Sequence, residues 1–186
     1  MLLTKKLKMG LFAFTLLFAV VVATSASAES RTKDAQRQVT DQLADFQRTA
    51  SQLHREADTF NSRRLSRVSW QSHSYHLENL AEQVNQLGRS LAELEAIKPA
   101  ASENQRMAIE HARPHLVSIA QNTTRAIELL KDNRGSIHFA EYGDTASAIY
   151  DHADSLHTKL EAILDFEDAK ARLDELELQP KPSEGS

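Results

Sequence analysis

The sequence contains no cysteine, so no disulfide can stabilise the fold and no thiol can act as a nucleophile. It also lacks HExxH, GxSxG and a glycine-rich phosphate loop, which are short patterns that carry enzyme chemistry. We therefore predict that the protein is not an enzyme and that it holds no cofactor. Its stability has to come from apolar burial, or from a bound ligand or partner.

Glycine is scarce, with five residues among 186, and long helices can therefore form. The apolar residues recur with alternating steps of three and four over the stretches 39–60, 70–94, 109–130 and 139–163. That spacing is typical of helices that pack along a single apolar seam. The sequence predicts an all-α fold, an antiparallel up-down-up-down four-helix bundle with coiled-coil packing.

The first 28 residues have the three parts of a secretory signal peptide. Lys5, Lys6 and Lys8 precede an apolar run at 11–23, and the small residues 26–28 form a cleavage site. The apolar run has 13 residues, fewer than the roughly 20 that a membrane-spanning helix needs. No cysteine follows the small residues, so we expect no lipid anchor there. We predict export, to the periplasm or out of the cell, and no membrane span after cleavage.

Cleavage would leave 158 residues, enough for one domain with its own core. It removes three lysines and no acid, so the net charge changes from −4 to −7. An acidic chain is a poor general nucleic-acid binder, and we expect no nucleic-acid partner.

Local signals mark the ends of the expected helices. Ser69 is suited to cap the second helix, Pro99 follows its end, and 102–105 reads as a capping box that opens the third. Gly135 is suited to a left-handed cap after the third helix, and Ser136 begins the fourth. The connections are short, so consecutive helices should be antiparallel neighbours. We place the bundle at 29–178 and a disordered tail at 179–186.

The register of the third and fourth helices places Ile119 opposite Ile149 and Ala126 opposite Tyr142. At the same bundle end, Trp70 should lie level with Phe139, and His73 should be a core histidine bonded to the Tyr142 hydroxyl. Thr123 should be buried, with its hydroxyl bonded back to its own helix.

An alternative interpretation makes the histidines metal ligands, because imidazole is a common ligand for zinc and copper. One candidate group gathers at the Trp70 end: His54, His73, His76 and His138. A second lies across the groove between the third and fourth helices: His111, His115 and His152. Both groups are equally compatible with ordinary half-exposed histidines.

Basic residues also gather at the Trp70 end of this acidic chain, and helix N-termini point the same way. They are Arg55, Arg63, Arg64, Arg67, Lys131 and Arg134. This end could bind an anionic envelope component or a protein partner, although charged loop residues are often simply solvated.

The fourth helix should outrun its neighbours. Its apolar stripe continues through Phe166, Ala169, Leu173 and Leu176, where the register leaves little to pack against. Such a stripe favours self-association or docking to a partner, and the alternative is a frayed helix.

Three stretches resemble a family of exported bacterial helical-bundle proteins without an assigned activity: SWQSH (69–73), NTTRAIELL (122–130) and AKARLDEL (169–176). The resemblance implies an exported helical fold and carries no site residue or cofactor. The sequence as a whole favours a non-enzymatic exported bundle with a binding or scaffold role, and the alternative is a periplasmic metal-binding protein that uses histidines.

Overall fold

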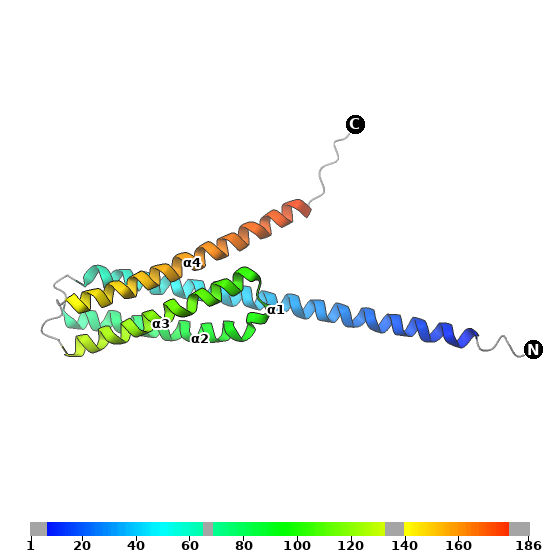
Figure 1. Cartoon of the computed structure of the whole chain (residues 1–186), viewed down its shortest axis with the longest axis horizontal. Helices are drawn as coiled ribbons and strands as arrows, with labels where there is room; N and C mark the ends of the chain where they lie inside the picture. Colours follow the sequence, from blue (N-terminus) through cyan, green and yellow to red (C-terminus); the bar gives the residue numbers. More distant parts are fainter. Residues whose placement is uncertain (1–6, 65–68, 133–139, 179–186) are drawn as a thin grey trace, which may run out of the picture. The chain divides into compact units, whose positions relative to one another are not determined.

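The computed structural model describes residues 7–64, 69–132 and 140–178, with side chains from residue 31 to residue 177 within these ranges. Helices are the only regular secondary structure among the described residues (Figure 1). The elements are α1 (Leu7–Arg63), α2 (Trp70–Ile97), the short 3-10 helix η1 (Lys98–Ala100), α3 (Glu103–Asp132) and α4 (Ala140–Leu178).

The chain divides into two units, Met1–Gln38 and Val39–Ser186. The first unit contains the beginning of α1, where the described side chains from 31 to 38 are exposed apart from the half-buried Ala35. No helix among the described residues is long and apolar enough to cross a membrane. Cleavage after Ala28 stays a prediction.

The second unit is the predicted four-helix bundle, and the fold class is confirmed. Figure 1 shows α2, α3 and α4 side by side, with α3 in contact with both of the others. Residues of α1 from Thr40 onward form the fourth helix of the bundle, between α2 and α4. Glu56 of α1 contacts His76 of α2, and Ser51 of α1 contacts His157 of α4.

Most of the core positions are those that the heptad spacing selected, from Val39 on α1 to Leu160 on α4. Ala101, Ala108 and Leu129 are buried in addition, whereas Trp70 and Ile163, which the spacing also selected, are only partly buried.

The helix boundaries follow the expected local chemistry. The Ser69 side chain caps α2 by accepting a hydrogen bond from the Ser72 amide. At the start of α3, the Gln105 amide donates to the Ser102 hydroxyl at 3.1 Å, and the Ser102 amide donates to the Gln105 side chain at 2.9 Å. This reciprocal pair is the predicted capping box. The signals predicted at Gly135 and Ser136, and the tail, lie outside the described residues.

The fourth helix extends past the bundle, as predicted. Leu160 is its last fully buried side chain, and the Ser102 hydroxyl donates to Glu167 at 2.6 Å, which ties α4 to the start of α3. Every described side chain from 168 to 177 is exposed. We call residues 165–178 the α4 extension.

Thr123 corrects one expectation. Its side chain is buried, but within the described structure its hydroxyl oxygen makes no hydrogen bond, so the predicted bond to its own helix is wrong. Thr has two common rotamers in a helix, and only some orientations bring the hydroxyl to the carbonyl of the preceding turn. The neighbouring, exposed Thr124 does make that bond, to the Ala120 carbonyl at 3.0 Å.

Candidate functional site

The Trp70 end of the bundle contains an aromatic cluster built from three helices. The His73 ring lies edge-on to Tyr142 and to Phe60, with ring centroids 5.5 Å and 6.0 Å away. The Tyr142 hydroxyl lies 3.0 Å from His73 Nδ1, and burial raises the pKa of the Tyr142 phenol well above its usual value. A phenol that stays protonated can donate to this nitrogen. His73 is therefore the predicted core histidine, and its side chain is only 1 % exposed. Phe139 lies outside the described residues.

His76, one turn farther along α2, bridges to α1. Its Nδ1 lies 2.6 Å from Glu56 Oε1, and its Nε2 lies 3.2 Å from Arg63 Nη1. The guanidinium can only donate, so Nε2 accepts its hydrogen bond and the ring proton on Nδ1 is donated to Glu56. Both ring nitrogens are thus used in joining α1 to α2.

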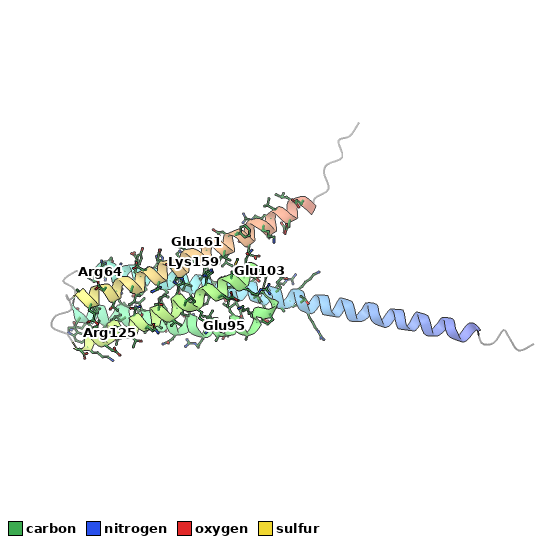
Figure 2. All side chains as sticks on the ribbon, in the orientation of Figure 1. Arg64, Glu95, Glu103, Arg125, Lys159 and Glu161 are labelled. Carbon is green, nitrogen blue, oxygen red and sulfur yellow. The ribbon has the colours of Figure 1, made fainter. Side chains whose placement is uncertain are left out.

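Two of the basic residues at the Trp70 end, which we call the basic end, form hydrogen bonds with other groups of the same chain. Arg63 contacts His76, and Arg64 donates to the Asn61 carbonyl and side chain at 2.9 Å and 2.7 Å, which satisfies the end of α1. Figure 2 labels Arg64 at this end of the bundle and Glu103 at the opposite end. Arg55 and Lys131 are exposed.

Arg67 and Arg134, the other two members of the predicted anion site, lie outside the described residues. Anion binding at this end stays a prediction.

His54 faces α4 instead of the histidines of α2. Its ring stacks on His157, with centroids 5.0 Å apart and planes 19° apart. Its Nε2 lies 3.2 Å from Asp154 Oδ1 without the alignment of a hydrogen bond, and His157 Nδ1 lies 3.3 Å from the Ser51 hydroxyl.

His157 is not among the candidate histidines predicted from the sequence. Its only signal is its position one turn after Asp154, on the side of α4 that meets α1.

His115 and His152 meet across the groove between α3 and α4, as the register predicts. Their Nδ1 atoms are 3.4 Å apart. Burial, followed by the charges of Lys159, His152 and His111, lowers the pKa of His115 below its ordinary value. His111 itself is exposed.

Within the described ranges, no group of three or more His, Asp or Glu residues could hold a metal ion. His138 lies outside these ranges. The metal-site hypothesis therefore stays a prediction, and the His115–His152 pair is the part of it that has close geometry.

The α4 extension presents a continuous apolar stripe to solvent. Phe166 and Leu173 are each 61 % exposed, Leu176 is 63 % exposed, and Ala169 lies between them on the same stripe. The extension also carries six acidic residues and two basic ones. The stripe is therefore an apolar ridge on an acidic helix.

No protein-family model matches the sequence, and no curated protein or solved structure is significantly similar to it. A function has to follow from the surfaces of the bundle itself.

Proposed function

We propose that the protein is a non-enzymatic, exported four-helix bundle of the cell envelope that binds a partner through the α4 extension. The observation that carries the proposal is the row of three large apolar side chains, each more than 60 % exposed, on one face of a continuous helix. Scattered exposed apolar residues are common, but an aligned row of this kind is typical of an interaction surface.

The extension itself supports this proposal. Its 14 residues continue a helix that begins in the bundle, but they have little tertiary packing, and most helical stability in proteins comes from the packing of an apolar face. A partner that covers the apolar face would stabilise it, since burial of a Leu or Phe side chain contributes about 1.5–3 kcal/mol. Part of that gain is offset by the ordering of side chains on association.

The basic end is the weaker candidate for the same role. Arg63 and Arg64 already bind groups of their own chain, so an anionic partner would have to compete with those contacts. Export is supported by the three-part pattern of residues 1–28, and the non-enzymatic role by the lack of catalytic motifs in the sequence.

Site-specific cross-linking in the producing cells tests the proposal. A photoreactive side chain at position 173 should give a defined cross-linked product in the envelope fraction. The cross-linked protein should begin at Glu29, as the predicted cleavage requires. The same group at Glu175, on the opposite face of the helix, is the matched control and should give far less product. Equal products from both positions, or none from either, would contradict binding through the stripe.

A further inference from the structure

A surface groove runs between α2 and α3. It has a volume of about 550 Å3 and is open to solvent. Four lining residues, Val84, Leu91, Leu116 and Val117, provide branched apolar side chains, and Val117 is 49 % exposed. Val84, Leu91 and Leu116 are each only 5–7 % exposed and form the floor of the groove, whereas Val117 is the branched apolar side chain at its rim that solvent reaches.

Small residues make the groove wide. Gly88 lies on its α2 wall, and a Cβ atom added there would meet nothing within 4 Å. Ala92 and Ala120 line the neighbouring parts of the two walls. The groove is therefore open beside Gly88, where a side chain from outside could approach the α2 wall.

The charge of the groove is opposite to that of the protein. Arg89 and Arg113 are its charged lining residues, and both are basic, whereas the chain has a net charge of −4. The charge of Arg113 is partly neutralised by its ion pair with Glu95 on α2, so Arg89 contributes more to the positive potential of the groove. An occupant with an apolar ridge and acidic flanks would fit this surface best.

The chain carries such a ridge in the α4 extension. Phe166 and Leu176 are ten residues apart, about 15 Å along a helix, and Val84 and Ala92 on the groove wall are about 12 Å apart. Because α4 is one continuous helix as far as Leu178, the extension cannot fold back over the groove of its own chain. The complementary groove must then belong to another molecule.

We infer that the α4 extension of one molecule docks, apolar stripe inward, into the α2–α3 groove of a second copy of the same chain. This inference rests on the proposed function, since both assign binding to the extension, and it names the partner. If two copies exchange extensions reciprocally, the same contact forms twice around a twofold axis and the assembly closes as a dimer.

Complementary variants of the chain from Glu29 onward test the inference, and the core residues that the structure describes, from Val39 to Leu160, lie within that chain. The extension variant replaces Phe166, Leu173 and Leu176 by Gln, which favours helix and is tolerated at exposed positions. The groove variant is Gly88→Leu, which fills the space on the α2 wall. Gly88→Ala is its matched control, because one methyl group leaves most of the groove open.

Sedimentation velocity over a range of concentrations gives the expected result. The unaltered chain and Gly88→Ala should dimerise, whereas the extension variant and Gly88→Leu should each show a self-association Kd at least about tenfold higher, a loss of about 1.4 kcal/mol. An equimolar mixture of the two defective variants should form a mixed dimer, since one supplies the groove and the other the extension. Thermal melting of Gly88→Leu should not fall, because leucine favours helix more than glycine does.

Three outcomes would overturn the inference. The first is a monomeric unaltered chain at all accessible concentrations, and the second is a dimer that Gly88→Leu leaves intact. The third is an amphiphile that co-purifies with the unaltered chain and is lost from Gly88→Leu, because the groove would then belong to a small molecule. If position 173 cross-links to a different protein while the purified chain is monomeric, partner binding through the extension stands and self-docking fails.

Discussion

Thr123→Val should stabilise the bundle, because it replaces a buried hydroxyl that has no hydrogen bond within the described structure. Thr123 is 2 % exposed and lies on the core face of α3, one turn after Ile119 and just before Ala126. Val has nearly the same shape and a similar helix propensity, so the exchange changes the polarity of one group and little else. The perturbation thus isolates the free energy of burying an unpaired hydroxyl.

The magnitude follows from the desolvation of that group. A buried donor or acceptor left without a partner costs about 1–3 kcal/mol, and the new methyl group adds up to about 0.8 kcal/mol of apolar burial. We expect the free energy of unfolding to rise by about 1–3 kcal/mol. For a domain of this size, each kcal/mol raises Tm by roughly 2–4 °C.

Urea denaturation followed by circular dichroism measures the change. Thr124→Val is the matched control, because its exposed hydroxyl donates to the Ala120 carbonyl, and we expect a change within about 0.5 kcal/mol. Thr123→Ser keeps the hydroxyl and loses the methyl group, so it should destabilise the fold by about 1 kcal/mol. A less stable Thr123→Val protein would mean that the hydroxyl has a partner after all, and it would refute the reasoning.

Three further predictions concern the polar groups between the helices. Tyr142→Phe removes the hydrogen bond to the buried His73 and should lower the free energy of unfolding by about 1–3 kcal/mol, so an unchanged urea midpoint would contradict the assigned bond. The pKa of His115 is lowered in the fold, first by burial and then by Lys159 and His152, so the unfolded chain binds more protons below about pH 6.5. The contribution of neutral His115 to the free energy of unfolding is complete above that pH and is lost as the pH falls toward the lower folded pKa. His115→Gln should therefore reduce the change in the free energy of unfolding over this pH range. Zinc at a hundred times its Kd should add about 2.7 kcal/mol if His115 and His152 bind it, with the gain absent in His115→Gln, and no thermal shift would end the metal hypothesis for this pair.

The parts of the fold set by local chemistry and heptad spacing could be predicted from the sequence. The Ser102–Gln105 capping box needs only two side chains and two amides that are close in sequence, so nothing distant can alter it. The meeting of His115 with His152 follows from a short connection that holds α3 and α4 in one register. Both predictions depend on distances along a helix, which the sequence states directly.

The contacts at the edges of the seams could not be predicted in the same way. Whether His54 faces α2 or α4 depends on the rotation of α1 about its own axis, because the residue lies beside the apolar stripe and not on it. The structure turns it toward His157. The Thr123 hydroxyl depends on a rotamer, and the width of the groove at Gly88 depends on how closely α2 and α3 approach each other. The rotation of a helix, a side-chain rotamer and the distance between two helices leave no repeating pattern in the sequence, so they could not be predicted from it.

The charge distribution explains why the extension would choose the groove over other apolar surfaces. Two copies of an acidic chain repel each other, and the six acidic residues of the extension add to that repulsion wherever it meets another acidic surface. At the groove the sign reverses, because the charged lining residues are Arg89 and Arg113. Apolar burial supplies most of the free energy of docking and is not selective, whereas the arginines make one site favourable among many.

Self-association should therefore weaken as salt rises, since screening shortens the reach of these charges from about 30 Å at 0.01 M to about 10 Å at 0.1 M. Arg89→Glu places a carboxylate opposite the acidic extension, so it should weaken binding and remove or reverse its weakening by salt. A dimer of the unaltered chain that tightens as salt rises would show net repulsion between the two copies, and it would contradict a favourable role of the groove arginines.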